Sequence, residues 1–243
     1  MYYIDSIATS ETLKKDVKVL IPDTMLRRRM SSLVKRSVAT AMECLLDVAA
    51  GGESGAKATK DKKPDAIITA TTLGFLEDSE KFLKNIFENN EELLNPTPFI
   101  QSTFNTVGAQ IAILTGNQSY NMTYSQRADS FADALIDAFI RIGQHNAKSV
   151  LVGAFDEKTP TFLDLIKHLR LREPKHEGAV FMLISKEKSI NTLAGIDITS
   201  LISSRSQTTA CSALDTPFEI VNALPCLKTE HNIAVSNIIL SRI

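Results

Sequence analysis

The chain has 243 residues, of which 44% are hydrophobic and 23% charged, and its formal net charge at pH 7 is −1. This composition is typical of a globular domain with enough chain to bury a core without metals or disulfides. The nearly neutral charge excludes an electrostatic argument for binding nucleic acid or a membrane surface. No apolar run approaches the ~18–20 residues that span a bilayer, and no signal peptide is expected from the first residues.

The three cysteines, Cys44, Cys211 and Cys226, are an odd number and lack the spacing of metal ligands. They indicate free thiols in a reducing cytoplasm. We therefore expect a cytoplasmic protein with no metal and no cofactor.

The first half of the chain predicts two strands and a long helix. Residues 1–8 have the character of a short strand. A helix is expected to start near Asp23 or Thr24 and to continue with helical spacing of apolar residues as far as Leu46. The uninterrupted β-prone run at 66–71 is typical of a strand buried on both faces.

Strands and helices then alternate along the chain, which predicts an α/β layer structure. Helices are expected at 76–90, 101–115 and 127–143, and strands at 119–124, 149–154 and 178–185, with weaker strand signals at 196–202 and 233–240.

The segment from Gly116 to Leu135 contains a glycine turn, a short strand, a tight bend at Ser125 and Gln126, and an Ala-rich helix. It resembles the nucleophile turn of the β-ketoacyl synthases of the thiolase superfamily. Further matches to that family occur in the same order along the chain, at Arg29–Met30, Thr69–Gly74, Pro98–Ala112, Gly153–Ala154 and Glu177–Ala179. The resemblance implies a thiolase-like layered α/β/α architecture with mixed sheets and a truncated second half. It also implies one ketosynthase-like domain over 1–243, with an N-terminal half at 1–155 and an abbreviated C-terminal half at 156–243.

In that family the bend carries a cysteine that accepts the acyl chain. Here Gln126 takes the cysteine position, or Ser125 if the register slips by one residue. An amide is no nucleophile, although it can donate a hydrogen bond to a carbonyl oxygen, and the chain resembles chain-length-factor subunits, which carry Gln at this position. The plainer alternatives are that Gln126 caps the helix or that Ser125 is its N-cap.

The other catalytic groups of the family have no visible counterpart. The histidines of this chain, none of which stands in the family's sequence contexts, are His145, His168, His176 and His231. Cys211 lies in a segment that mimics the ketosynthase Thr-Ala-Cys-Ser motif, but in the wrong half of the chain. We assign no catalytic residue and leave open whether the protein is an enzyme, with a negative answer favoured. An acyltransferase or acyl hydrolase using Ser125 or Cys211 is the alternative.

The resemblance implies a non-catalytic subunit that acts with a true β-ketoacyl synthase and an acyl carrier protein in fatty-acid, aryl-polyene or polyketide-type biosynthesis. The partner would be the ketosynthase in a heterodimer or a second copy in a homodimer, with no nucleic acid and no membrane. Interface residues would be Tyr120, Met122 and Tyr124, which alternate with polar residues.

Three further features of the sequence concern binding surfaces. The resemblance implies substrate contacts at Phe99, Asn105 and Phe131. With a shortened second half, the helices at 101–115 and 127–143 are expected to leave apolar surface uncovered. The basic cluster Arg27–Arg29 is expected at a helix start, either as a solvated face or as a docking patch for an acidic carrier protein.

Overall fold

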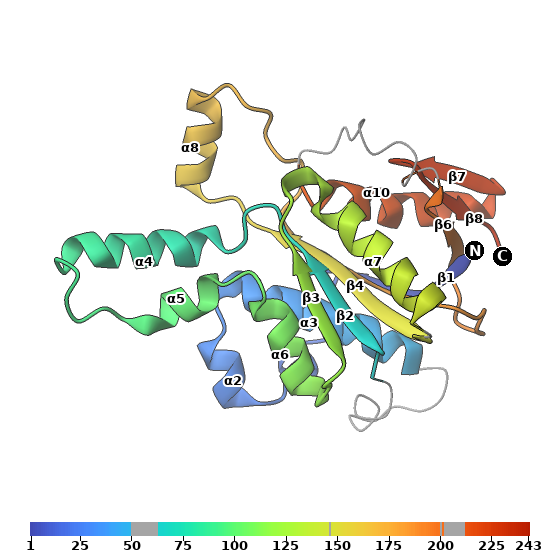
Figure 1. Ribbon diagram of the computed structural model, residues 1–243, viewed down its shortest axis with the longest axis horizontal. Coiled ribbons are helices and arrows are strands. Elements are labelled where there is room, and N and C mark those ends of the chain that lie inside the picture. Colours follow the sequence, from blue (N-terminus) through green and yellow to red (C-terminus); the bar gives the residue numbers. More distant parts are fainter. Residues whose placement is uncertain (50–62, 146, 200, 202–211) are drawn as a thin grey trace.

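A mixed eight-stranded sheet, in the order β3-β2-β4-β5-β1-β6-β8-β7, forms the centre of the computed structural model (Figure 1). The structure describes residues 1–49, 63–145, 147–199, 201 and 212–243. The strands are β1 (Tyr2–Thr9), β2 (Ala66–Ala70), β3 (Tyr120–Tyr124), β4 (Ser149–Asp156), β5 (Gly178–Ser185), β6 (Ala194–Asp197), β7 (Asn232–Val235) and β8 (Ile238–Ser241). Strand β2 runs parallel to β3 and β4, and the other pairs are antiparallel.

Helices cover both faces of this sheet. The α-helices are α1 (Val17–Leu20), α2 (Thr24–Arg29), α3 (Ser32–Ala49), α4 (Leu76–Glu88), α5 (Pro96–Ser102), α6 (Thr106–Thr115), α7 (Ser130–Gln144), α8 (Pro160–His168) and α10 (Asp215–Ala223), and the 3-10 helices are η2 (Arg127–Asp129) and η3 (Leu224–Lys228). Helices α3 and α6 share one apolar cluster with the sheet, and α7 and α10 share the other. The alternation of side chains along β2 divides its residues between the two clusters, with Ile67 in the first and Ile68 in the second. The predicted α/β/α layering is confirmed.

Two of the predicted helices are each divided in the structure. The helix expected from Asp23 to Leu46 breaks at Met30, whose backbone is extended and whose side chain is buried. Asp23 caps α2 by accepting a hydrogen bond from the Leu26 N–H. The expected position of Arg27–Arg29 at a helix start is wrong, because these residues form the last turn of α2, where positive charge suits the helix dipole.

The helix expected at 101–115 is likewise two helices, α5 and α6. Asn95 caps α5, and Pro96 occupies its first turn. Helix α6 packs closely on β3 as its small residues suggest, since the Asn121 amide donates to the Gly108 carbonyl at 2.9 Å. The weak strand signal at 233–240 is a hairpin of β7 and β8, turned by Ser236 and Asn237 in the left-handed region.

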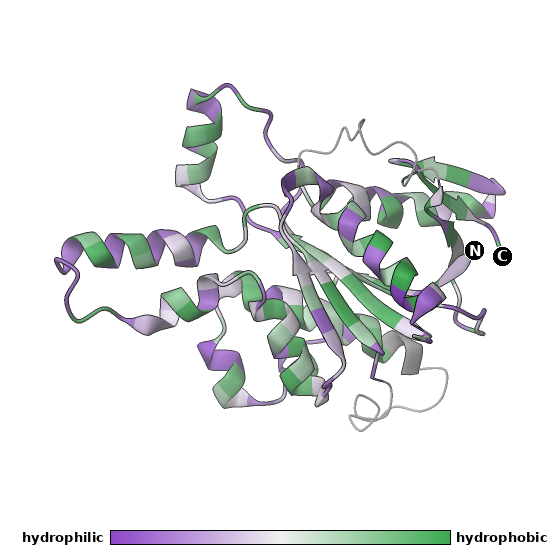
Figure 2. Cartoon of the chain, in the orientation of Figure 1, coloured by the Kyte–Doolittle hydropathy of each residue, from purple (hydrophilic) through white to green (hydrophobic). Residues whose placement is uncertain are grey.

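Helices α4 and α5 form an arm that projects away from the sheet (Figure 1). None of the residues 81–100 in this arm is buried. Hydrophobic positions nevertheless recur along both helices, as Figure 2 shows. The arm residues Leu83, Phe87, Leu93, Phe99 and Ile100 are all exposed. The two helices pack on each other, with the Phe82 and Phe99 ring centroids 5.2 Å apart, but the arm keeps much apolar surface exposed.

Candidate functional site

The bend after β3 is held in place by one buried hydroxyl. Ser130 at the start of α7 is fully buried, and its Oγ accepts a hydrogen bond from the Gln126 N–H at 2.7 Å. The same Oγ lies 2.8 Å from the Thr71 carbonyl and 2.7 Å from the Arg127 carbonyl, to either of which it can donate. Through this hydroxyl the end of β2, the bend and α7 form one unit.

Arg127 has a left-handed backbone, with φ at 55°, at the centre of this bend. Such values are uncommon for residues other than glycine. Gln126, with φ at −120°, occupies the N-cap position of η2, which leads directly into α7, but its side chain makes no capping hydrogen bond. Ser125 caps neither helix, since Asp129 occupies the N-cap position of α7. The equivalence of Gln126 to the family's nucleophile remains a prediction.

A pocket of about 300 Å³ opens beside this bend, at the carboxyl ends of the parallel strands β2 and β4. Ligands of open α/β sheets bind at this edge of the sheet. Residues from the bend, from the ends of both strands, from α8 and from the segment before β5 line it, including Thr72, Arg127, Asp156, Glu157, Lys158, Phe162, Ile166, Leu171, Arg172 and His176.

Asp156, the last residue of β4, is the polar centre of the pocket. Its carboxylate accepts hydrogen bonds from the Thr71 hydroxyl at 2.8 Å and from the Thr72 N–H and hydroxyl at 2.8 and 2.6 Å. The Thr72 oxygen in turn accepts from the Ala213 N–H at 2.7 Å. Burial raises the pKa of the Asp156 carboxyl above its ordinary value, and the hydrogen bonds oppose that rise. Asp156 therefore ties the ends of β2 and β4 to the chain that precedes α10.

Glu157 follows directly and has a different environment. It accepts a hydrogen bond from the Glu77 N–H at the start of α4, at 2.8 Å. Burial raises the pKa of Glu157 to about 7, and the nearby carboxylates Glu77, Asp78 and Glu80 raise it further, against that hydrogen bond. This carboxyl group therefore changes its protonation state near neutral pH.

Among the residues that the structure describes, three cationic side chains and an apolar wall complete the pocket. Lys158 forms an ion pair with Glu173 at 3.3 Å, and Arg127 and Arg172 lie at the same pocket. His176 stacks on Phe218 of α10 with the ring centroids 4.4 Å apart. The arrangement can hold a small ligand that has one charged and one apolar end.

None of the residues predicted to contact substrate lines this pocket. Phe99 is exposed on α5, Asn105 is exposed before α6, and Phe131 is buried in the core under α7. The prediction of these three as substrate contacts stays untested, although the structure does not bring them together.

The predicted interface residues of β3 are divided between two environments. Tyr120 donates a hydrogen bond to Asp137 of α7 at 2.9 Å, and the Arg141 guanidinium lies 3.5 Å from the centre of the Tyr120 ring. Burial raises the pKa of Tyr124 to about 12. Met122 is 40% exposed at the unpaired edge of the sheet. The two tyrosines therefore stabilise the contact between β3 and α7, and Met122 is the side chain available to a partner.

The remaining residues that the sequence singled out lie elsewhere. Cys44 is buried, with its sulfur 3.0 Å from the Ser6 hydroxyl. Cys226 is exposed in η3, and Cys211 lies outside the described residues. Within the described residues, no cluster of three or more His, Cys, Asp or Glu side chains is arranged to hold a metal ion. In that same part of the structure, no helix is long and apolar enough to cross a membrane.

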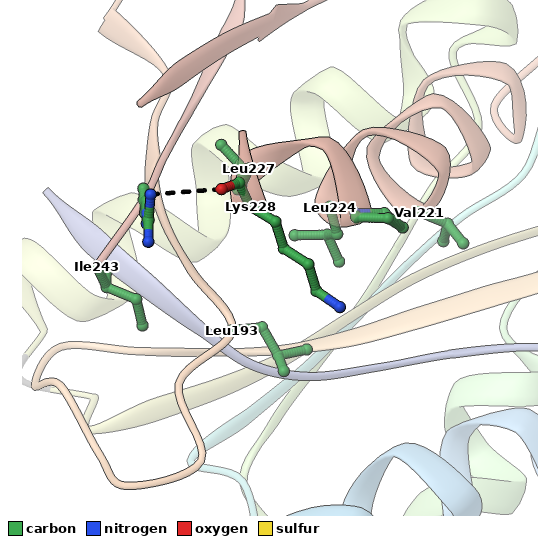
Figure 3. Close-up of a pocket in the computed structure, with 8 residues that line it drawn as sticks. Leu193, Val221, Leu224, Leu227, Lys228 and Ile243 are labelled. Carbon is green, nitrogen blue, oxygen red and sulfur yellow. Dashed lines mark hydrogen bonds between the residues drawn. The ribbon is translucent and has the colours of Figure 1, made fainter. Parts of the chain in front are cut away.

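A second pocket, of about 530 Å³, lies at the other end of the molecule between η3 and the end of the chain (Figure 3). Its wall is largely apolar, with Leu193 and Leu227, and Arg242 donates a hydrogen bond across it to the Lys228 carbonyl at 3.4 Å. It contains none of the residues that the sequence analysis singled out.

Sequence reasoning missed Glu157, Lys158 and Arg172 as pocket residues. The charged run that follows the buried strand 149–154 was the available signal, because polar residues at the carboxyl end of such a strand face the binding edge of the sheet. No comparable signal marks Arg172, which reaches the pocket from the segment between α8 and β5.

Solved structures of similar fold are ketosynthases and their complexes. The complex of the ketosynthase ApeO with its chain length factor ApeC from Xenorhabdus doucetiae matches with a TM-score of 0.62 and 19% identity, covering 100% of this chain and 97% of the matched chain. The ishigamide ketosynthase/chain length factor matches with a TM-score of 0.59 and 19% identity over 75% of this chain, which spans about half (51%) of that one. A type II PKS acyl-carrier protein in complex with its ketosynthase, AntDE:AntF, matches with a TM-score of 0.63 and 13% identity, covering 81% of this chain and 67% of that one.

These matches define a protein of the ketosynthase fold. The family model for the β-ketoacyl synthase N-terminal domain matches residues 6–237, so the chain belongs to that family. A search of curated proteins gave no match.

Proposed function

We propose that this chain is a non-catalytic, ketosynthase-like subunit that pairs with a β-ketoacyl synthase. It acts in the cytoplasm with that enzyme and an acyl carrier protein, in fatty-acid, aryl-polyene or polyketide-type biosynthesis. The observation that carries the proposal is the bend after β3, which keeps a strand–turn–helix geometry but holds Ser125, Gln126 and Arg127 in place of a thiol. A condensing enzyme needs a nucleophile that accepts the acyl group.

The surroundings of the bend support the absence of condensing activity. Of the described residues that line the pocket, one is a histidine, His176, whose ring is stacked against Phe218. Asp156 is fully occupied by hydrogen bonds from threonine side chains and backbone. Neither group is hydrogen-bonded to the Ser125 hydroxyl, so no base for a serine nucleophile is in place among the described residues.

The exposed apolar surface supports pairing with another subunit. Strand β3 is an unpaired sheet edge, with Met122 exposed along it. Helix α6 beside it exposes Ile113, and the segment between α5 and α6 exposes Phe104. Apolar residues on an edge strand and its neighbouring helices mark an interaction surface. The similar structures that contain a ketosynthase with its chain length factor favour a ketosynthase as the partner.

The test is reconstitution of condensation with purified components. Acyl and malonyl carrier thioesters are incubated with this chain, with a β-ketoacyl synthase from the same organism, or with both, and β-ketoacyl products are measured by mass spectrometry. We expect no product from this chain alone, and product from the ketosynthase that increases at least several-fold or changes in length when this chain is added. Product from this chain alone that disappears in Ser125→Ala or Cys211→Ala would show that it is an acyltransferase.

A further inference from the structure

We propose that the pocket beside the bend binds a small organic carboxylate with an apolar tail, and that the Arg127 guanidinium holds the carboxylate. This binding is a property of the single chain and goes beyond pairing with a ketosynthase, so the two proposals succeed or fail separately.

Arg127 is the cation of the pocket that is available to a ligand. Within the described part of the chain, its guanidinium takes part in no hydrogen bond or ion pair, whereas Lys158 is engaged by Glu173. A guanidinium presents parallel N–H donors that match the two oxygens of a carboxylate. Lys158 and Arg172 line the same pocket and add positive potential around the ligand.

The two acidic residues of the pocket do not cancel this attraction. Asp156 is buried, and its carboxylate already accepts three hydrogen bonds from Thr71 and Thr72. Glu157 has a pKa raised to about 7 by burial, so a large share of its carboxyl groups carries no charge at neutral pH. Burial raises the pKa of both carboxyls, which reduces the negative charge that an anion in the pocket meets, and Arg127 supplies positive charge beside them.

The remaining wall fits an apolar tail. Phe162 and Ile166 project from α8, and Leu171 lies in the segment that follows it. The volume of about 300 Å³ is at the lower end of the range of small-molecule sites, which indicates a short or medium chain. Apolar surface opposite a cation is the arrangement that recognises an amphipathic anion.

The backbone of Arg127 supports a binding role for its side chain. Its φ of 55° places it in the left-handed region, which costs free energy for a residue with a side chain. Ser130 holds the turn by accepting from the Gln126 N–H and by lying 2.7 Å from the Arg127 carbonyl. Residues kept in such conformations cluster at active sites, ligand clamps and switch regions.

The experiment measures binding of octanoate, 1-octanol and octyl phosphate to the full chain by isothermal titration calorimetry at pH 7. We expect saturable 1:1 binding of octanoate, at least tenfold tighter than that of 1-octanol, which has the same tail without the charge. Octyl phosphate distinguishes a carboxylate site from a general anion site. If octyl phosphate bound more tightly than octanoate, the site would be assigned to phosphate esters and the carboxylate proposal would be overturned.

Variants identify the cation responsible. Arg127→Gln should weaken octanoate binding at least tenfold and leave 1-octanol binding unchanged, whereas Arg28→Gln, which removes the same charge from an exposed position of α2, should change neither. The proposal would be refuted if octanoate and 1-octanol bound the unmodified chain with equal affinity, or if octanoate showed no saturable binding. Equal effects of the two variants on octanoate binding would also refute it. The comparison of octanoate with 1-octanol uses the unmodified chain, so it tests recognition of the carboxylate even if Arg127→Gln fails to fold.

Discussion

Two adjacent carboxylates, Asp156 and Glu157, show how environment sets the behaviour of a residue. Asp156 is the last residue of β4 and Glu157 is the next residue, and burial raises the pKa of both carboxyls. Asp156 gains three hydrogen bonds from Thr71 and Thr72, whereas Glu157 gains one, from the Glu77 N–H, and faces the carboxylates of α4. Glu157 accepts fewer hydrogen bonds than Asp156, and its titration near neutral pH is expected to influence the free energy of unfolding.

The Glu157→Gln variant tests this expectation. The folded-state pKa of Glu157 is about 7, above its ordinary value of 4.5, so the folded chain binds the proton more tightly than the unfolded chain does. The free energy of unfolding that this group contributes is present at low pH and is lost as pH rises from about 4.5 to about 7. Gln keeps an oxygen that can accept from the Glu77 N–H and removes the charge.

We therefore expect Glu157→Gln to raise the free energy of unfolding by about 1–2 kcal/mol at pH 8, a figure reduced for partial exposure to solvent, and to have little effect at pH 4.5. Urea unfolding followed by circular dichroism at the two pH values measures it. Lys84→Gln on the exposed face of α4 serves as a control for a change of one charge in the same region. An equal effect at both pH values would contradict the assigned pKa.

At the scale of elements, the contact between β4 and β5 depends on one glycine. Gly153 is paired with Phe181 across the two strands, and a Cβ atom at position 153 would overlap the Phe181 ring. Both strands are buried in the middle of the sheet, so neither can move aside cheaply. The absence of a side chain at Gly153 leaves the space that the aromatic ring fills.

Gly153→Ala should therefore lower the free energy of unfolding by about 1–3 kcal/mol through overpacking. Phe181→Leu removes the ring that causes the overlap, so in the double variant the added cost of Gly153→Ala should shrink by about 1 kcal/mol or more. A double-mutant cycle based on chemical denaturation gives the coupling. Additive effects of the two substitutions would mean that the contact does not limit packing here.

At the scale of the whole molecule, the uncovered apolar surface determines the expected state of association. The arm of α4 and α5 has no buried residue between 81 and 100, and Met122 and Ile113 are exposed at the sheet edge and on α6. Obligate interfaces commonly bury more than ~2,000 Å² in total. A chain with this much apolar surface is not expected to remain a monomer in solution.

Analytical ultracentrifugation at micromolar concentration should show a homodimer for the isolated chain and a heterodimer in the presence of a ketosynthase partner. Met122→Arg at the sheet edge should weaken both at least tenfold, and Ile190→Arg, on an exposed loop between β5 and β6, should weaken neither. Met122 is chosen as the position to substitute because Tyr120 and Tyr124 both lie near Asp137 within the fold. An aspartate in place of either tyrosine would bring a second carboxylate close to Asp137 and disturb the fold itself. A stable monomer, unchanged by Met122→Arg, would exclude the proposed interface.

The local sequence pattern determined two kinds of element: strands that are buried on both faces, and elements that are bounded by turn residues such as glycine. The apolar runs at 149–154 and 178–185 are strands, and the strand and bend at 119–126 lie where the glycine at 116 and the following Ala-rich segment predicted them. A buried strand must be apolar throughout, and a turn needs particular residues, so both are visible in a few consecutive positions. The order of these elements along the chain was enough to predict the layered fold and the family.

Contacts between distant parts of the chain decided the rest. Met30 ends α2 because its side chain is buried in the core, although its neighbours have helical spacing. The pocket exists because sheet pairing brings Thr72, Arg127 and Asp156 together from three separate segments, and α8 and the chain after it close the apolar side. Local propensity contains no information on which strand ends become neighbours, because that choice is made by burial of the whole sheet between its helices.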